Sequence, residues 1–168
     1  MTEPAIVPAA VLVPLLRRPE GPTLLLTRRA MSVATHKGQI AFPGGAVEPV
    51  DASVEAAALR EAAEEIALPP ENARVLGVLP VQHTWTGFEV FPVVAQIDEV
   101  PALVPNPKEV AQIFEVSLAW LRTPGVFQRL DREVGGRRFT DYRYSTAEGV
   151  VWGLTGRIIY DLLHSAFV

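Results

Sequence analysis

Residues 53–68, SVEAAALREAAEEIAL, are the stretch that constrains the fold of this chain most strongly. They are rich in alanine and glutamate and contain no proline or glycine, a composition typical of an α-helix. Asp51 or Ser53 is placed to cap its first turn, because both side chains accept hydrogen bonds from free backbone N–H groups. Pro69-Pro70 should end the helix, since a proline disfavours helical geometry in the residue before it.

One face of this predicted helix is acidic. Glu61, Glu64 and Glu65 are spaced i, i+3 and i+4 and therefore share a face. Four apolar residues fall on the opposite side, so we expect the acidic face to point outward: Leu59, Ala62, Ala63 and Ile66. A divalent cation would relieve the repulsion among the carboxylates, and oxygen ligands of this kind suit Mg²⁺ or Mn²⁺. The alternative is a solvated face on which Arg60 pairs with Glu64.

The residues on either side of the helix alternate between strand and turn signals. We predict strands at 5–16, 22–27, 39–42, 74–81 and 90–97, with weaker strand signals at 114–116 and 139–144. Residues 101–107 form a proline-rich loop, and 154–167 have the periodicity of a closing amphipathic helix. Strands combined with two helices predict an α/β fold in which helices cover the faces of a sheet.

Composition limits the class of protein. The 168 residues, 49% of them hydrophobic, fit one domain spanning 1–168. A net charge of −4 argues against a nucleic-acid partner, and the absence of cysteine excludes disulfides and zinc–thiolate sites. The apolar N-terminal run is interrupted by Pro8 and Pro14 and is shorter than the roughly 20 residues of a membrane span. We expect a soluble cytoplasmic protein with no membrane partner, and the sequence leaves a homodimer open.

The helix and the glycines in front of it together resemble the Nudix box. The matching residues are Gly44-Gly45, Asp51 and Arg60-Glu61-Ala62-Ala63-Glu64-Glu65-Ile66-Ala67-Leu68, so the box covers approximately 44–68. Ala67 stands where the late glycine is usual, and the spacing from Gly45 to Arg60 is one residue longer than the common form. The resemblance implies a three-layer α/β/α sandwich with a mixed sheet. It also implies metal-dependent hydrolysis of a pyrophosphate bond, with water as the nucleophile.

A second motif resembles the coenzyme A pyrophosphatase branch of that family. It consists of Leu25-Leu26-Thr27-Arg28-Arg29-Ala30, Gly38 and Phe42-Pro43-Gly44-Gly45, whereas Ala34 stands where the branch usually has arginine. The implied reaction converts coenzyme A, or its derivatives, to 3′,5′-ADP and 4′-phosphopantetheine. Two alternatives remain: a pyrophosphatase for another nucleoside diphosphate derivative such as ADP-ribose or a dinucleotide cofactor, and a non-catalytic nucleotide-binding module.

The resemblance also assigns roles around the metal. Glu61 and Glu65 are the expected principal ligands of Mg²⁺ or Mn²⁺, with Glu64 as a third ligand or a ligand through water. The Gly45 carbonyl is a further candidate ligand. Arg60 is expected to orient the carboxylates by hydrogen bonds.

Substrate contacts and the general base are assigned less narrowly. Arg28 and Arg29 end a predicted strand, so alternation sends them to opposite faces and only one readily enters the site. Arg29 is the stronger candidate for gripping a phosphate, and Gly44 and Gly45 let a ligand approach the backbone. Glu109 is a candidate base or extra metal ligand, with His83 as the alternative base. Three aromatic residues either stack on an adenine or pack in the core: Trp85, Phe88 and Phe91.

Overall fold

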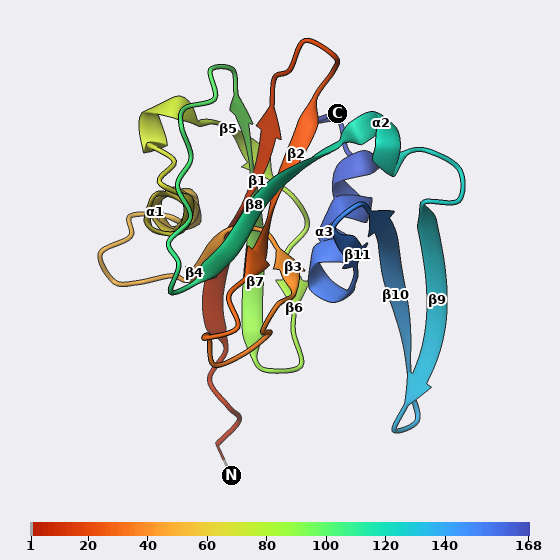
Figure 1. The fold of residues 1–168 in the computed structure, drawn as a ribbon. Helices are drawn as coiled ribbons and strands as arrows, with labels where there is room; N and C mark the ends of the chain where they lie inside the picture. Colours follow the sequence, from red (N-terminus) through yellow and green to blue (C-terminus); the bar gives the residue numbers. More distant parts are fainter. Residues whose placement is uncertain (1) are drawn as a thin grey trace.

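A mixed sheet of eight strands forms the centre of the molecule in this computed structural model, which describes residues 2–168 (Figure 1). Its strands are β1 (Val7–Leu16), β2 (Thr23–Arg29), β3 (Ile40–Ala41), β4 (Gly44–Ala46), β5 (Arg74–Val78), β6 (Gln82–His83), β7 (Phe88–Ile97) and β8 (Val110–Ser117). The order along the sheet is β3-β2-β1-β7-β5, with β4 on β1, β6 on β7 and β8 on β2. The strands β1 and β7 run parallel and the other pairs are antiparallel, which makes the sheet mixed.

Helices cover both faces of this sheet, as expected for an α/β sandwich. Figure 1 shows α1 (Val54–Ile66) on one side and α3 (Gly153–Leu163) on the other. A second sheet of three strands packs against α3 and comprises β9 (Phe127–Val134), β10 (Arg137–Thr146) and β11 (Gly149–Val151). Two short helical segments complete the fold, η1 (Pro70–Asn72) and α2 (Leu118–Leu121).

Alternation along the strands divides the core into two apolar clusters. On β1, Leu12 and Leu16 pack on the α1 side with Ile66, whereas Val13 and Leu15 pack on the α3 side. The alanines of α1 at 57, 58 and 62 are fully buried, and their small size lets the helix lie close to the sheet. The core therefore fixes α1 against β1 and β4, which is the arrangement that positions the candidate site.

The two ends of α1 are stabilised differently. Ser53 is the N-cap, because its hydroxyl oxygen accepts a hydrogen bond from the Ala56 N–H at 3.1 Å. Asp51, the other predicted cap, pairs with Arg60 instead. The helix ends at Ala67, which adopts a left-handed conformation with φ 55°, before the prolines are reached. The prediction that Pro69-Pro70 end the helix is therefore wrong by two residues, because the left-handed C-cap at Ala67 already ends it after Ile66.

The predicted strands and helices mostly exist, with shifted ends. The signal at 114–116 belongs to an eight-residue strand, and the predicted strand at 74–81 ends at Val78. The sequence reading missed β4, β6, β9, β11, η1 and α2. These elements are short or strongly polar, so neither period-2 alternation nor helical periodicity marks them clearly.

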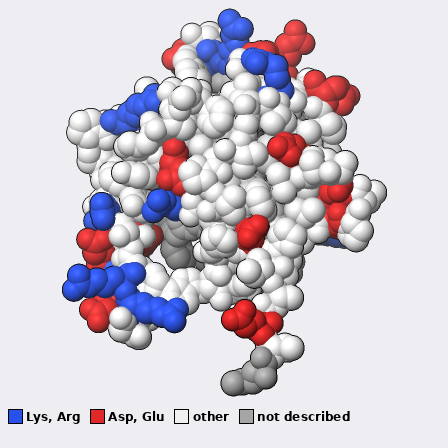
Figure 2. Space-filling model, turned by 180° about the vertical axis from the view of Figure 1, so that it is seen from behind, with Lys and Arg blue, Asp and Glu red and all other residues white. Residues whose placement is uncertain are grey.

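The surface carries no large field of one sign on the face that Figure 2 shows, where basic and acidic side chains are interspersed. Several charged side chains of the molecule are paired, including Arg18 with Glu115 at 2.9 Å and Arg129 with Asp131 at 3.7 Å. In the described part of the chain, no helix is long and apolar enough to cross a membrane.

Candidate active site

Arg60 connects the loop before α1 to the glutamates on the helix. Its guanidinium donates two hydrogen bonds to the Asp51 carboxylate, at 2.8 and 2.9 Å, and one to the Ala46 carbonyl at 3.2 Å. It also donates to Glu61 at 3.2 Å and to Glu64 at 3.3 Å. The Arg60 guanidinium lowers the pKa of Asp51, and its own pKa is raised by this carboxylate. Arg60 therefore occupies a position from which it orients the carboxylates, as the sequence predicts.

Glu61 lies directly against the glycine pair that precedes the helix. A Cβ built on Gly45 would lie 2.5 Å from one Glu61 carboxylate oxygen and 2.8 Å from its carboxyl carbon. Any side chain at position 45 would therefore displace Glu61. Burial raises the pKa of Glu61, and the Arg60 charge opposes that rise. The close approach of strand and carboxylate explains why a glycine is needed at this point.

Glu65 lies deeper in the same place. Its residue is only 6% exposed, and one carboxylate oxygen accepts a hydrogen bond from the Gly44 N–H at 3.1 Å. Burial raises the pKa of Glu65 to about 8, because the charged form loses its water, while the hydrogen bond from Gly44 lowers it. The prediction that the acidic face points outward is therefore wrong: β4 crosses that face and covers Glu65, and only Glu64 is largely exposed.

The side chains of Glu61 and Glu65 both line a pocket with a volume of about 540 Å³. Arg29 and Glu109 line the same pocket, Arg29 from the end of β2 and Glu109 from the loop just before β8. The Glu109 charge raises the pKa of both Glu61 and Glu65, and the Arg29 charge lowers that of Glu65. The pocket thus brings together six predicted site residues, namely Arg29, Gly44, Gly45, Glu61, Glu65 and Glu109, and Glu64 is not among the residues that line it.

The donor set in this pocket fits a divalent cation. Mg²⁺ is usually bound by one or two carboxylates, with water and substrate phosphates completing its shell. Glu61 and Glu65 supply two carboxylates beside the backbone of Gly44-Gly45, and a cation there would favour their charged forms. Within residues 2–168, no three His, Cys, Asp or Glu side chains converge enough to enclose a metal by themselves. A bound metal would therefore depend on ligands beyond the acidic side chains.

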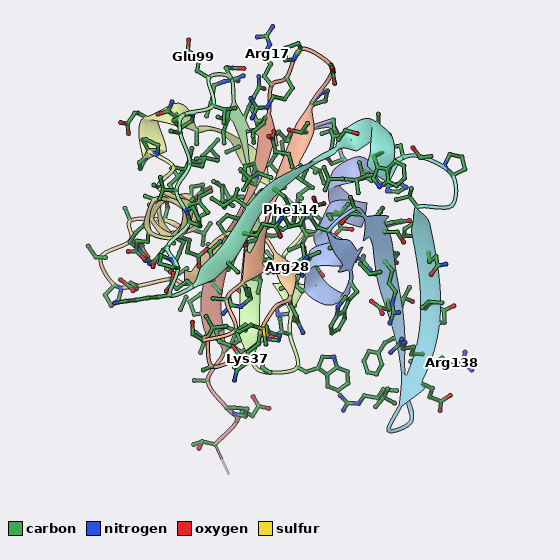
Figure 3. All side chains as sticks on the ribbon, viewed as in Figure 1. Arg17, Arg28, Lys37, Glu99, Phe114 and Arg138 are labelled. Atoms are coloured by element: carbon green, nitrogen blue, oxygen red, sulfur yellow. The ribbon has the colours of Figure 1, made fainter. Side chains whose placement is uncertain are left out.

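The two neighbouring arginines of β2 point to opposite sides, as alternation predicts. Arg29 enters the pocket, where its Nε donates to the Thr35 carbonyl at 3.4 Å. Arg28 donates to the carbonyls of Gly38, at 3.1 Å, and Glu148, and it does not line the pocket. Figure 3 shows Arg28 in the middle of the molecule, on the side that faces α3. Its contacts fasten the β2–β3 loop to the β10–β11 turn.

The remaining candidates are dispersed. His83 is 4.0 Å from the Glu89 carboxylate and exposed, and it does not line the pocket. Trp85, in the loop between β6 and β7, packs edge-on against Phe139 of β10, with ring centroids 4.5 Å apart. Among the three aromatic candidates, Phe88 alone lines the pocket, and Phe91 is partly buried on β7 away from it.

Sequence reasoning noted that Val151-Trp152-Gly153-Leu154-Thr155 also resembles the coenzyme A pyrophosphatase branch, but it assigned no site residue to a second wall of the pocket. This wall is the start of α3, and it contributes Trp152, Gly153, Leu154, Thr155 and Ile158. The chain reaches the pocket there because Gly153 has a left-handed φ of 62° and Gly156 packs directly on the Tyr142 carbonyl of β10. The closely spaced glycines of Trp152-Gly153-Leu154-Thr155-Gly156 were the available signal.

Comparisons with known proteins agree on one family. A family model described as NUDIX domain matches residues 7–140. The chain is 47% identical over 154 residues to a Pectobacterium atrosepticum protein named uncharacterized Nudix hydrolase NudL, covering 92% of this chain and 80% of that protein. A MutT/nudix family protein from Enterococcus faecalis has a similar fold, with a TM-score of 0.62, 20% identity and coverage of 96% and 62%. The NUDIX domain of Shewanella oneidensis NrtR, complexed with ADP ribose, matches with a TM-score of 0.56 and 21% identity. The match covers 70% of this chain and 76% of that chain.

Proposed function

This chain belongs to the Nudix hydrolase family, and from that premise we propose that it hydrolyses the pyrophosphate bond of coenzyme A or a coenzyme A derivative. The products are 3′,5′-ADP and 4′-phosphopantetheine. The observation that supports pyrophosphate hydrolysis is the pairing of Glu61 with Gly45 and of Glu65 with Gly44, inside a pocket that also holds Arg29 and Glu109.

Nudix hydrolases generally use divalent metal ions. We assign Glu61 and Glu65 as carboxylate ligands of Mg²⁺ or Mn²⁺ here, with the Gly45 carbonyl as a backbone ligand and Glu64 as a ligand through water. When bound, such an ion neutralises phosphate charge and lowers the pKa of a coordinated water. Arg60, held by Asp51, keeps Glu61 and Glu64 in place and does not itself line the pocket.

The chain's other pocket residues act on the substrate and the nucleophile. Arg29 grips one phosphate by charge-assisted hydrogen bonds. Glu109 accepts a proton from the attacking water, whose oxygen forms a bond to phosphorus while the bridging P–O bond breaks. The bridging oxygen leaves on the second phosphate, so one water is consumed and two phosphate monoesters form. The exposed position of Glu109 at the pocket edge suits a base that returns its proton to solvent.

The choice of coenzyme A rests on the motif that runs from Leu25 to Gly45. Several of its residues lie around the pocket: Arg29 enters it, and Phe42 and Gly44-Gly45 line it. A volume of about 540 Å³ lies within the usual range for pockets that bind cofactor-sized ligands. The ADP-ribose that the similar NrtR domain binds makes nucleoside diphosphate sugars the second candidate class.

A substrate panel tests this proposal. The purified protein is incubated with Mg²⁺ or Mn²⁺ and coenzyme A, 3′-dephospho-coenzyme A, ADP-ribose or a dinucleotide cofactor, and the products are identified by mass. We expect coenzyme A to give the highest kcat/KM, above that of 3′-dephospho-coenzyme A. Faster cleavage of ADP-ribose would assign the second class, and binding of these ligands without any product would leave only a nucleotide-binding module.

A further inference from the structure

Arg28 lies behind the pocket and joins three segments that are far apart in the chain. It pairs with Ile40 across β2 and β3, and Ile40 lines the pocket whereas Arg28 does not. One Nη atom donates to the Gly38 carbonyl at 3.1 Å, and the other donates to the Glu148 carbonyl. Its Nε donates to the Gln112 side-chain oxygen on β8 at 3.5 Å. The guanidinium therefore connects the β2–β3 loop, β8 and the β10–β11 turn.

The β2–β3 loop, residues 30–39, forms one side of the pocket. It contributes four lining residues: Val33, Thr35, His36 and Gln39. The loop returns to β3 through two left-handed residues, His36 with φ 56° and Gly38 with φ 68°. A residue with a side chain keeps this conformation only where surrounding contacts hold it. The hydrogen bond from Arg28 to the Gly38 carbonyl is such a contact, and it acts at the end of the lining segment.

The β10–β11 turn leads into the α3 wall. Its shape is fixed locally, because the Thr146 hydroxyl donates to the Gly149 carbonyl at 2.8 Å. A Cβ built on Gly149 would lie 3.6 Å from the Ile40 side chain and 3.9 Å from an Nη atom of Arg28, so the turn packs on both. Three residues later the chain reaches Trp152, which lines the pocket. The position of this turn therefore sets where the chain enters the α3 wall.

The shape of the guanidinium, and no ion pair, makes this connection. Within residues 2–168, Arg28 has no ion-pair partner, and its acceptors are two carbonyls and one amide oxygen. A guanidinium offers five N–H donors in a planar fork, so it reaches acceptors on several sides at once. A lysine ammonium keeps the charge but not the fork. Lysine and glutamine at position 28 thus separate the effect of charge from the effect of geometry.

We propose that Arg28 is a positioning residue for substrate binding. Its guanidinium holds the β2–β3 loop to the β10–β11 turn, and so keeps two pocket-forming segments in one arrangement without touching the substrate. When a protein occupies its binding arrangement only part of the time, its apparent affinity falls by that fraction. Glu61 and Glu65 lie on α1, outside these segments, so the bound complex should react at its usual rate. The expected kinetic effect, which rests on the proposed function, is therefore a higher KM at constant kcat.

Steady-state kinetics on the most rapidly cleaved substrate of the panel measures this effect. Arg28→Gln should raise KM about threefold to tenfold, as expected when only about a third to a tenth of the molecules hold the binding arrangement. Its kcat should stay within about twofold of the wild-type value. Arg28→Lys should show most of the same increase in KM. Arg18→Gln is the matched control, because it breaks a fork to Glu115 away from the pocket, and it should change neither constant.

Hydrogen exchange followed by mass spectrometry tests the connection without any substrate. In Arg28→Gln, the backbone amides of 31–39 and of 147–152 should both exchange faster than in the wild type, while those of α1 keep their rates. Gly149→Ala provides an independent variant, since φ is 134° there and a side chain strains the turn. Combined with Arg28→Gln, it should raise KM no further than the larger single effect, because both changes act on one contact.

Several results would overturn the assignment. Unchanged exchange of the two segments in Arg28→Gln would do so whether or not any substrate is cleaved. A lower kcat at unchanged KM would place Arg28 in the chemical step, and full rescue by Arg28→Lys would leave only its charge. If no substrate of the panel is hydrolysed, the proposed function fails, and the exchange rates alone decide the role of Arg28. Should Arg28→Gln not fold, Arg28→Lys carries the same measurements.

Discussion

The pocket has one wall formed by α1 with β4 and another formed by the start of α3. Both walls depend on a close contact at a glycine, but only the first carries charged side chains. On the α1 wall, Gly45 lets the strand β4 approach the Glu61 carboxylate, and on the α3 wall, Gly156 lets the helix approach the Tyr142 carbonyl. The first wall presents two carboxylates, and the second presents the indole of Trp152 and uncharged side chains of α3. The contact at Gly45 thus positions the Glu61 side chain, whereas the contact at Gly156 positions the whole helix α3.

This difference decides what each wall tolerates. The contact at Gly45 is with the end of a side chain, which can rotate away, whereas the contact at Gly156 is with a backbone carbonyl in β10, which cannot. Changes on the α1 wall should therefore act on chemistry at nearly constant stability. Changes at the root of the α3 wall should act on stability first.

The largest expected effect concerns the carboxylates of the α1 wall. Glu61→Gln and Glu65→Gln should each lower kcat by orders of magnitude, because the amide removes a negative charge that the metal needs, and a chelator should abolish activity until Mg²⁺ or Mn²⁺ is restored. Glu64→Gln is the control on the same helix, since that side chain is 54% exposed and outside the pocket, and it should do less. Near-normal turnover in folded Glu61→Gln and Glu65→Gln would refute the metal assignment.

The α1 wall was the part of the site that the sequence could reveal. Glutamates at i, i+3 and i+4 must share a helical face, so spacing alone predicts the cluster of Glu61, Glu64 and Glu65, whereas the choice of Glu61 and Glu65 within it came from the resemblance to the Nudix box. Which way that face points was not predictable: it depends on β4, a strand of three residues with no side-chain pattern. Alternation on β2 likewise separated Arg28 from Arg29 correctly, because it depends only on the backbone.

The α3 wall was hidden for a related reason. The glycines at 153 and 156 mark a turn and a close approach, but nothing in the sequence shows that the helix start between them lines a pocket. Their position depends on contacts between distant segments, such as Gly153 with Asp141 and Gly156 with Tyr142. The closing helix itself was expected at 154–167 and is found at 153–163, so the element was predictable and its place in the wall of the pocket was not.

The same substitution in both walls tests the comparison directly. Gly156→Ala would place a Cβ on the Tyr142 carbonyl oxygen, and we expect it to destabilise the fold by about 1–3 kcal/mol. Gly45→Ala should leave the melting temperature nearly unchanged but lower kcat/KM by about tenfold or more, because the displaced Glu61 carboxylate leaves its position. Thermal unfolding and kinetics on both variants measure this. A stable Gly156→Ala or a fully active Gly45→Ala would break the distinction between the walls.

A smaller effect is expected at Arg29, the cation of the pocket. Arg29→Ala should lower kcat/KM roughly tenfold or more on coenzyme A and on 3′-dephospho-coenzyme A alike, since one charge-assisted contact contributes about 1.5–3 kcal/mol. Arg17→Ala is the matched control. That side chain follows the last residue of β1, is 76% exposed, does not line the pocket and lies 3.9 Å from the Asp98 carboxylate. Equal kinetics for Arg29→Ala and Arg17→Ala would remove Arg29 from the phosphate site.

The smallest effect lies at the end of α1, where the helix that carries the acidic wall stops. Ala67 is held at φ 55° and ψ 33°, and its N–H is accepted by the carbonyls of Ala62 and Ala63. A left-handed conformation costs a residue with a Cβ about 1–2 kcal/mol, whereas glycine adopts it freely. Glycine also loses more backbone entropy on folding, about 0.5–1 kcal/mol relative to alanine, and this offsets part of the gain.

The difference between these two effects sets the sign for Ala67→Gly. We expect this variant to raise the free energy of unfolding by about 0.5–1 kcal/mol, which is measured by denaturant titration at unchanged slope. Ala63→Gly is the control inside the same helix: it has no left-handed strain to relieve and should lower the stability by about 0.5–1 kcal/mol. Activity should stay constant in Ala67→Gly, because the turn lies beyond Glu65. A loss of stability in both variants would mean that Ala67 is not held in the left-handed conformation in solution.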